Sequence, residues 1–402
     1  MNIGIVTMWF ERGAGYVSRQ YRQAFSLAHN VFIYARAGEY PKGDPIWDDA
    51  SVTWGKVSTL PVATAIDKQD FEDWIKEKKI EVVFFNEQQW WEPLKWCLHL
   101  GIKTGAYVDY YTEETMPFFA AYDFLICNTK RHYSAFSWHP QAFYIPWGTD
   151  INVFKPQSFE QSDVDKITFF HSAGYSPKRK GTDFVIQAFK NITKPAKLIL
   201  HSQVELKKAL PQQKEVIQQL ETEGSLECIC KTVTAPGLYH LGDVYIAPSR
   251  LEGLGLPMIE SQACGLPLVT CDNPPMNEFI AEGMGYAAKI DRLWSRSDGY
   301  YWPQCSANIA NLTEILDFYA GQLSHISDFK RTARHYAEDK FNWMDRAESI
   351  NSIIYESRID EERKTTAVKE AVNFERNRQG IMYRFARRYP LLWQLYRKIR
   401  YD

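Results

Sequence analysis

The stretch PSRLEGLGLPMIE, residues 248–260, indicates the fold of this chain most clearly. The residues before it, 242–247 (GDVYIA), are a short apolar run that opens on turn residues, which predicts a buried strand. Residues 257–264 are mostly good helix formers, and the following GLP at 265–267 is a typical helix stop. The stretch therefore lies on a turn between a strand and a helix, the unit from which α/β sheets are built.

This turn has the residue types of a site for a phosphorylated sugar. Gly253 and Gly255 let the backbone approach a ligand, and free N–H groups at the start of a helix can hold an anion. Glu252 lies in the turn and Glu260 lies in the helix, with seven residues between them. Each carboxylate can accept hydrogen bonds from hydroxyl groups. An anion site flanked by two such carboxylates suits a ligand made of phosphate and sugars.

Composition places the chain among globular proteins with several domains. Its 402 residues predict about two to three domains, and 45% hydrophobic residues suffice for sizeable cores. The net charge of −2 gives no general attraction to nucleic acid, which we do not expect as a partner. The seven cysteines include no C-x-x-C pair, so we expect free thiols in a reducing compartment. Without a signal peptide pattern or a long apolar run, we expect a cytoplasmic protein.

The first half repeats the pattern of strand, glycine turn and helix. Residues 3–7 predict a strand, and Gly13 and Gly15 lie in the turn that follows it. Ser18 replaces the third glycine of the dinucleotide-binding pattern, so the two glycines either cradle a ligand or simply make a tight turn. Alternation of strands with helices predicts a parallel sheet, with further strands at 31–35, 81–87, 103–110, 123–128 and 142–146.

Ligands of parallel sheets bind beyond the carboxyl ends of the strands. In the first half this rule selects the acidic residues Glu87, Asp109 and either Glu113 or Glu114. We expect Asp109 to line the reaction centre, and helix capping is the ordinary alternative for such a residue.

The second half predicts a second domain of the same type. The loop 174–181 follows a strand at 167–171 and carries Lys178, Arg179 and Lys180 before a helix. These cations can bind a diphosphate, arginine bidentately and lysine as a point charge, although such loops are often merely solvated. We therefore expect two α/β domains with a cleft between them.

Three segments together resemble the retaining glycosyltransferases of family 4, the glycosyl transferases group 1, which have the GT-B fold. They are residues 145–156 (IPWGTDINVFKP), residues 179–189 (RKGTDFVIQAF) and residues 248–267, which carry the two spaced glutamates. The resemblance covers nearly the whole chain and weakens after about residue 355. It implies two Rossmann-like α/β domains facing each other across a cleft. The implied parts are an acceptor-side domain at 1–155, a nucleotide-sugar-binding domain at 156–345, and C-terminal helices at 346–402 that cross back to the first domain.

The resemblance also implies roles for single residues. Arg179 and Lys180 would bind the donor's diphosphate, Glu260 the ribose hydroxyls, and Glu252 the donor sugar. Such enzymes need no metal ion and no cofactor besides the nucleotide-diphosphate sugar, so the cations and helix N-termini would stabilise the leaving group. The catalytic group would consist of Glu252, Arg179 and Lys180, to which we add our own candidate Asp109. The residues expected to bind the donor are Glu260, Gly253, Leu254, Gly255, Gly13 and Gly15.

The chain departs from the family pattern in three places. Trp147 stands where many members have an asparagine. Gly174 stands where many have an arginine, so Arg179 or a later lysine such as Lys207 would supply the second cation. The histidine that often lines the reaction centre has no clear counterpart, and residues 108–111 (VDYY) occupy its expected place.

From about residue 376 the chain becomes basic and aromatic, and Pro390 would divide this tail. Such a composition suits an interfacial helix on an anionic membrane, whereas the alternatives are a helix docked on the first domain or a partner-binding helix. The cations are Arg376, Arg378, Arg384, Arg387, Arg388, Arg397, Lys398 and Arg400.

These observations predict a retaining, metal-independent glycosyltransferase of the hexosyltransferase type. It would move a sugar from a nucleotide-diphosphate sugar to a glycan or lipid-linked acceptor, in cell-surface polysaccharide or lipopolysaccharide synthesis. We expect it in the cytoplasm, peripheral on the inner face of the cell membrane if the tail binds lipid. A second enzyme reading is a related GT-B enzyme that is an epimerase, a phosphorylase or a synthase of a small disaccharide or glycoside. The alternative from another class is a non-catalytic sugar-binding or scaffold protein of the GT-B fold, against which the diphosphate cations argue.

Overall fold

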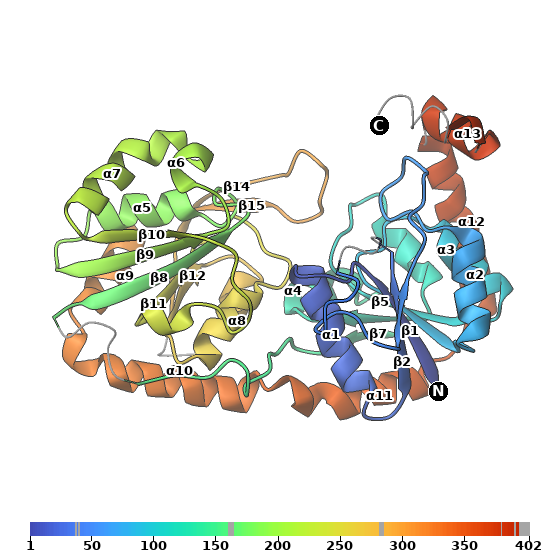
Figure 1. Cartoon of the computed structure of the whole chain (residues 1–402), viewed down its shortest axis with the longest axis horizontal. Helices are drawn as coiled ribbons and strands as arrows, with labels where there is room; N and C mark the ends of the chain where they lie inside the picture. The colour runs from blue at the N-terminus through green and yellow to red at the C-terminus, as the bar shows by residue number, and fades with distance from the viewer. Residues whose placement is uncertain are drawn as a thin grey trace. The chain divides into compact units, whose positions relative to one another are not determined.

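The computed structural model describes residues 1–36, 38, 41–159, 165–280, 285–378, 380–389 and 391–393. The chain folds into two compact units (Figure 1). The first contains Met1–Pro146 and Asp345–Asp402, and the second contains Trp147–Met344. The change of unit after Pro146 comes earlier than the boundary expected at 155, because residues 147–149 are tied to the second unit. Trp147 packs on Trp343 with ring centroids 4.5 Å apart, and the Thr149 amide donates to the Phe341 carbonyl at 2.7 Å.

The first unit is built on a seven-stranded parallel sheet with the order β3-β2-β1-β4-β5-β6-β7. Its central strands are apolar and buried because helices cover both faces of the sheet. The strands are β1 (Asn2–Thr7), β2 (Asn30–Ala35), β3 (Val52–Trp54), β4 (Val82–Phe85), β5 (Lys103–Tyr107), β6 (Phe124–Cys127) and β7 (Ala142–Tyr144).

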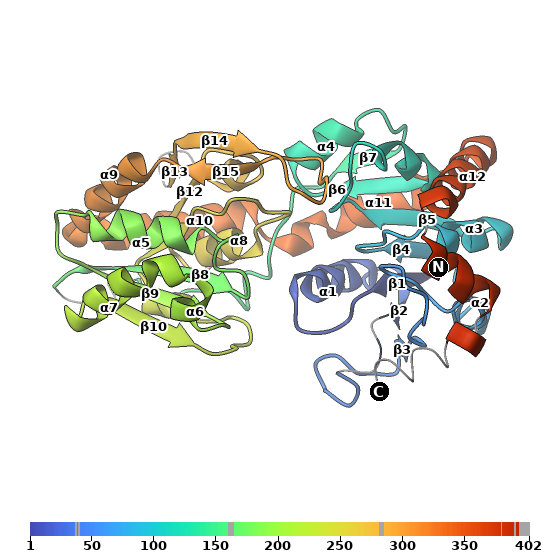
Figure 2. The same cartoon turned by 90° about the horizontal axis from the view of Figure 1, so that it is seen from above.

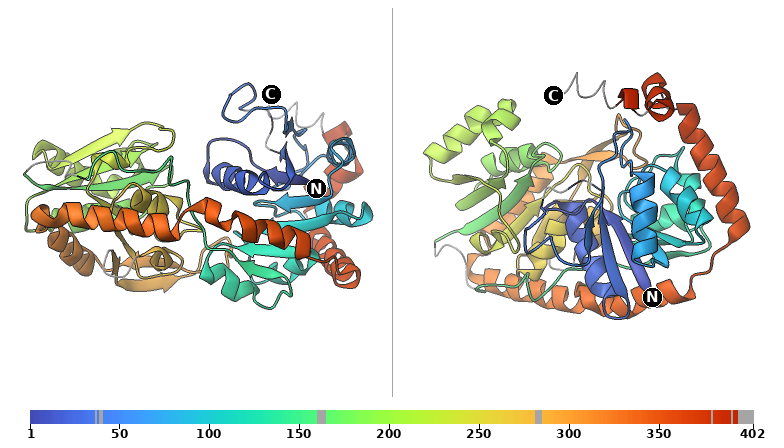
Figure 3. Two further views of the ribbon diagram at one scale, coloured as in Figure 1. Left: turned by 90° about the horizontal axis from the view of Figure 1, so that it is seen from below. Right: turned by 45° about the vertical axis from the view of Figure 1, so that its right-hand side comes forward.

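Helices from both ends of the chain cover this first sheet. Helix α1 packs with α11 on one face, and α12 packs with α3 and the 3-10 helix η1 on the other (Figures 1 and 3). Residues 345–402 therefore belong to the first unit. The helices are α1 (Gly13–Phe25), α2 (Lys68–Glu77), α3 (Glu92–His99), η1 (Met116–Ala121), α4 (Lys130–Phe136), α11 (Ala347–Glu356), α12 (Glu361–Arg378) and α13 (Ile381–Arg388).

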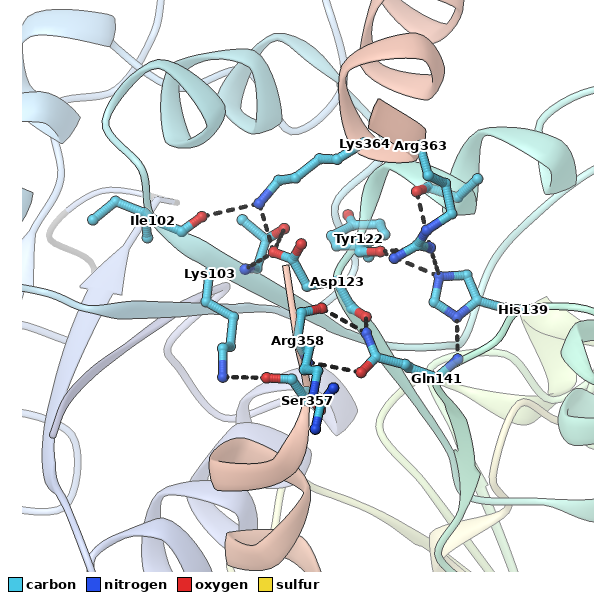
Figure 4. Close-up of polar contacts among 12 residues, drawn as sticks. Ile102, Lys103, Tyr122, Asp123, His139, Gln141, Ser357, Arg358, Arg363 and Lys364 are labelled. Carbon is cyan, nitrogen blue, oxygen red and sulfur yellow. Dashed lines mark hydrogen bonds and ion pairs between the residues drawn. The ribbon is translucent and has the colours of Figure 1, made fainter. Parts of the chain in front are cut away.

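Buried polar side chains hold α12 to the sheet (Figure 4). Nζ of Lys364 donates to the Ile102 carbonyl at 3.0 Å and lies 2.5 Å from Oδ2 of Asp123. The same carboxylate accepts from the amide of Thr104 at 2.6 Å. Between α11 and α12, Nζ of Lys103 donates to the Ser357 carbonyl at 2.6 Å. These contacts fix the connection between the last helices and strands β5 and β6.

The second unit contains a six-stranded parallel sheet with the order β10-β9-β8-β11-β12-β13 (Figure 2). The residues 290–307, where sequence patterns gave no strand, add an antiparallel hairpin of β14 and β15. The strands are β8 (Ile167–Gly174), β9 (Ala196–Ser202), β10 (Leu226–Cys230), β11 (Val244–Ala247), β12 (Leu268–Cys271), β13 (Tyr286–Ala288), β14 (Ile290–Trp294) and β15 (Gln304–Ala307).

Helices also cover both faces of the second sheet. Helix α5 packs with α7 and α9, and α8 packs with α10 on the other side (Figure 1). The expectation of two parallel-sheet, Rossmann-like α/β domains is confirmed. The main helices are α5 (Thr182–Lys190), α6 (Leu206–Ala209), α7 (Lys214–Thr222), α8 (Leu256–Ala263), α9 (Ile309–Ala320) and α10 (Ile326–Lys340), joined by the 3-10 helices η2 (Pro211–Gln213), η3 (Tyr239–Leu241), η4 (Met276–Phe279) and η5 (Leu323–His325).

Within the described part of the chain, no helix has the length and apolar character needed to span a membrane.

Candidate active site

The two predicted site loops of the second unit lie at the same edge of its sheet. One loop, 175–181, connects β8 to α5, and the other, 248–255, connects β11 to α8. Strands β8 and β11 are hydrogen-bonded parallel neighbours, so their carboxyl ends deliver both loops to one place. The sequence separates these loops by more than sixty residues, and the order of the strands brings them together.

Arg250 fastens one loop to the other. Its amide donates to the Arg179 carbonyl at 2.8 Å, and its guanidinium binds both carboxylate oxygens of Asp183 at 2.7 Å. Its guanidinium carbon also lies 3.9 Å from the ring centroid of Phe184. At Gly181 the backbone has φ of 70°, and a Cβ there would lie 2.0 Å from the Pro248 carbonyl oxygen. The basic loop is therefore held in place by the glutamate loop. Sequence reasoning did not single out Arg250.

Glu252 lies between the two predicted phosphate-binding cations. Its Oε2 is 3.0 Å from Nη1 of Arg179, and its Oε1 is 2.7 Å from Nζ of Lys180. The hydroxyl of Ser249 donates to Oε1 at 2.6 Å. Burial by itself would raise the pKa of this carboxyl, but the charges of Lys180 and Arg179 lower it to about 2. The structure thus joins three of the predicted site residues in one charged cluster.

The cations of the cluster differ in exposure. The Lys180 side chain is 16% exposed and that of Arg179 is 43% exposed. Burial lowers the pKa of Lys180, and Glu252 opposes that shift. Lys207, the alternative second cation, pairs with Glu221 at 2.6 Å. Arg179 therefore accompanies Lys180 in this cluster.

The turn before α8 offers backbone donors next to the cluster. Gly255 is the N-cap of α8 with φ of 76°, a left-handed conformation that favours glycine. A side chain at Gly253 would meet nothing within 4 Å, which leaves room for a ligand at that position. Within the described part of the chain, the N–H groups of Gly253, Leu254 and Gly255 donate to no protein acceptor. Amides at a helix N-terminus can bind an anion.

Glu260 lies within α8 and is half-buried. Its Oε2 accepts a hydrogen bond from the Tyr239 hydroxyl at 2.7 Å. Burial raises the pKa of Glu260 to about 7, against the lowering effects of Tyr239 and the charge of Lys180. Tyr239 lies on η3 and packs on Tyr245 with ring centroids 5.6 Å apart. The sequence did not indicate Tyr239, because Tyr239 and its partner Glu260 are 21 residues apart and no local pattern links them.

A crevice with no room for a water molecule is lined by His171 and by Lys180, Glu252, Ser249 and Gly255. His171 is buried in the sheet, with its ring nitrogens 2.7 Å from the Ile246 carbonyl and 2.8 Å from the Thr182 hydroxyl. Burial lowers the pKa of His171 to about 4. This histidine therefore ties β8 to β11 and α5 as a neutral ring.

In the first unit, strand ends also bring charged residues together. Asp109 follows β5 and Glu87 follows β4, as predicted for the carboxyl ends of a parallel sheet. Buried Arg36, which follows β2, donates to the carbonyls of Asn86 and Glu87 at 2.8 Å each. Burial and the negative charge of Glu87 raise the pKa of Asp109 to about 7, although Arg36 lowers it. Arg36 was missed, although the rule that selected Asp109 also applies to it.

The other acidic candidates of the first unit lie elsewhere. Glu113 and Glu114 are exposed, and the Glu114 carboxylate pairs with Arg378 of α12. Glu114 is thus engaged with the C-terminal helix.

The glycine turn of the first unit has a structural explanation at one of its two positions. Gly13 begins α1, and a Cβ there would meet nothing within 4 Å. At Gly15 a Cβ would lie 2.1 Å from the Phe10 carbonyl oxygen and 3.0 Å from the Trp47 ring. Packing therefore requires Gly15, and ligand contact by either glycine stays a prediction. Ser18 is buried and donates to Oγ1 of Thr7 at 2.7 Å.

No metal centre is evident in the described part of the chain, where no three His, Cys, Asp or Glu side chains gather in a suitable group. The expectation of a metal-independent reaction stays a prediction. The cysteines of the described part are free thiols.

Comparison with known proteins identifies a family model that matches part of the second unit. Residues 165–294 match the family model described as "Glycosyl transferases group 1". The match covers both site loops of the second unit and confirms the resemblance to group 1 glycosyltransferases. Membership of family 4 in particular stays a prediction.

Two curated relatives match part of the chain. A probable sucrose-phosphate synthase of Thermosipho melanesiensis is 26% identical over 200 residues, 43% of this chain and 47% of that protein. A GDP-mannose-dependent monoacylated alpha-(1-6)-phosphatidylinositol monomannoside mannosyltransferase of Corynebacterium glutamicum is 26% identical over 192 residues, 41% of this chain and 48% of that protein. The chain spans about half the length of these relatives.

A solved structure with the same fold is Alr3699/HepE of Anabaena in complex with UDP-glucose. The similarity covers 88% of this chain and 99% of that chain, with a TM-score of 0.67 and 13% sequence identity. The predicted GT-B fold is confirmed for this chain.

Proposed function

We propose that the protein is a glycosyltransferase that takes its sugar from a nucleotide-diphosphate sugar bound to the second unit. The observation that carries this proposal is the position of Glu252, held between Arg179 and Lys180 beside the start of α8. Two cations and unpaired backbone amides suit a diphosphate, and a buried carboxylate fixes the cations in place. A scaffold protein would have no need for such a cluster.

In this proposal the chain's own residues share the work of donor binding. Arg179, Lys180 and the amides of residues 253–255 bind the diphosphate and stabilise its negative charge as it leaves. Glu252 orients both cations and accepts a hydrogen bond from a hydroxyl of the donor sugar. Glu260 accepts hydrogen bonds from the ribose hydroxyls, and its ionised carboxylate is the stronger acceptor. We propose retention of configuration without a metal ion, with the departing phosphate taking the acceptor's proton.

The acceptor belongs to the first unit in this proposal. The charged group of the first unit lies at the carboxyl ends of β2, β4 and β5 and consists of Arg36, Glu87 and Asp109. We propose a glycan or lipid-linked acceptor and a role in cell-surface polysaccharide or lipopolysaccharide synthesis. Support comes from the relative named for transfer to a phosphatidylinositol mannoside. The proposed place of action is the cytoplasm, at the inner face of the cell membrane.

A thermal-shift panel of nucleoside diphosphates and nucleotide sugars, in the presence of a chelator, tests the proposal. Uridine and guanosine compounds are both included, because relatives are named with UDP-glucose and with GDP-mannose. A ligand at a hundredfold excess over its dissociation constant adds about 2.7 kcal/mol of stability. We expect one base to be selected, and Lys180→Met to abolish its shift. If no compound of the panel changes the unfolding temperature, the result favours the non-catalytic alternative.

A further inference from the structure

Helix α13 and the residues after it have one side docked on the first unit. The side chains of Tyr383, Ala386 and Trp393 are buried. Nε1 of Trp393 donates at 2.6 Å to the carbonyl of Thr59, which lies 334 residues earlier in the chain. The tail is thus anchored through described residues as far as 393. The residues 394–402, with the last three cations of the tail, lie outside the described part.

The side of the helix next to this docked side is apolar and exposed. Met382, Phe385 and Tyr389 follow one another at spacings of three and four residues, which places them on one face of a helix. Leu391 and Leu392, which follow α13 in the sequence, are also exposed, and we call these five residues together the outer face. Its side chains are between 39% and 79% exposed. Phe385 and Tyr389 contact each other, with ring centroids 5.5 Å apart. The segment therefore has two apolar sides, and only one of them is used in packing.

Two arginines lie beside the outer face, and the guanidinium carbon of Arg388 is 5.6 Å from the ring centroid of Tyr389. Arg384 and Arg388 are exposed, and neither has an acidic partner within the described residues. By contrast, Arg376 pairs with Glu92 at 3.0 Å, and Arg378 pairs with Glu114. The sequence has no Asp or Glu between Glu375 and Asp402, although the chain as a whole has a net charge of −2. Positive charge is thus concentrated beside exposed apolar side chains.

We propose that the outer face of α13 docks the protein on an anionic lipid surface. Phe, Tyr, Met and Leu side chains beside arginines are the composition of helices that lie in the membrane interface. The apolar side chains enter the boundary between headgroups and acyl chains, and Arg384 and Arg388 contact the lipid phosphates. The buried contacts of Tyr383 and Trp393 hold the helix on the protein while its other side meets the lipid. Docking in this way does not require a bound donor.

Vesicle cosedimentation of the full chain tests this docking, with phosphatidylcholine alone and with phosphatidylcholine mixed with phosphatidylglycerol. We expect binding to the anionic vesicles that weakens with added salt, because salt screens the arginines. Each basic side chain changes the partition coefficient roughly fivefold, so R384E/R388E should weaken binding at least roughly 25-fold. Met382→Ser with Phe385→Ser and Leu391→Ser should weaken it as well.

A matched control removes exposed apolar side chains elsewhere in the first unit. Leu27→Ser with Ile46→Ser, at positions 66% and 51% exposed, should leave vesicle binding unchanged. Unaltered thermal unfolding of each variant shows that the fold is intact. Equal binding to neutral vesicles, or full binding by the outer-face variants, would overturn the proposal. A vesicle-free dimer that the outer-face variants abolish would also overturn it, since that face would then bind a second copy.

Discussion

At the scale of single residues, the site depends on carboxylates whose ionisation is set by their neighbours. Glu252 and Glu260 lie close in the sequence but have opposite environments. Glu252 is surrounded by cations and hydroxyl donors, which lowers its pKa to about 2. Glu260 has burial as its dominant influence, which raises its pKa to about 7. At neutral pH the first is a fixed negative charge, and the second can gain or lose its proton.

The ion pairs of Glu252 predict an acid-sensitive contribution to stability. The folded-state pKa is below the unfolded value of about 4.3, so the contribution is complete above that pH and is lost as pH falls toward 2. We expect Glu252→Gln to lower the free energy of unfolding by roughly 2–3 kcal/mol at about pH 7. Urea unfolding at about pH 3 should show a smaller difference between the two proteins.

A control for this comparison is Glu227→Gln, whose carboxylate pairs with Lys197 on the surface, at a side-chain exposure of 48%. It should change stability by less than about 1 kcal/mol. The ion-pair explanation would be contradicted if the difference in free energy of unfolding between Glu252→Gln and the parent protein did not vary with pH.

Tyr239 is predicted to be a positioning residue for Glu260. Ribose hydroxyls form stronger hydrogen bonds to the ionised carboxylate, so nucleotide affinity should rise with pH through about 7. The Tyr239 hydroxyl lowers this pKa, and Tyr239→Phe should therefore move the rise to higher pH. Isothermal titration across a pH series measures the midpoint. Tyr319→Phe, at a buried tyrosine of α9, is the control, and a midpoint common to all three proteins would refute the role of Tyr239.

At the scale of elements, the last helices stabilise the first sheet through a buried ion pair. The side chains of Lys364 and Asp123 are 1% and 0% exposed. Removing one partner of a buried pair leaves an uncompensated charge and costs about 3–5 kcal/mol. We expect this loss from Lys364→Ala, measured by amide hydrogen exchange in β5 and β6.

The double variant K364M/D123L separates charge from packing in this contact. Replacing both partners by apolar side chains is often close to neutral, so most of the lost protection should return. Lys208→Ala, in an exposed pair with Glu205, should leave the protection of β5 and β6 unchanged. If the double variant is as unstable as Lys364→Ala, burial of the pair is not the cause.

At the scale of the whole molecule, the sequence predicts most strands of the two sheets, but not β13, the hairpin of β14 and β15, or the contacts between distant segments. The alternation of apolar strands with helices predicted both parallel sheets, and the glycine turn after β11 placed the site loops. Contacts made by residues far apart in sequence could not be predicted. Neither Tyr239 with Glu260 nor Lys364 with Asp123 follows a local pattern. The hairpin of β14 and β15 was missed because its strands are only five and four residues long and their register is irregular between Ile290 and Arg292.

The candidate site was predictable to a similar extent. Arg179, Lys180 and Glu252 come together because they follow β8 and β11, which are neighbours in the sheet although two strands separate them in the sequence. Arg250 lay within the stretch that indicated the fold, yet its role in joining the two loops depends on Asp183 in another segment. Gly15 was read as a ligand position with a tight turn as alternative, and its packing against Phe10 and Trp47 supports the turn.

Hydrogen exchange of the full chain, with and without a saturating nucleotide diphosphate, tests the central claim most directly. If the second unit binds the donor through its two loops, exchange should slow at residues 178–182 and 253–256 while the amides around Asp109 keep their rates. Protection confined to other segments, or no protection with a nucleotide that saturates the protein, would contradict the assignment of these loops.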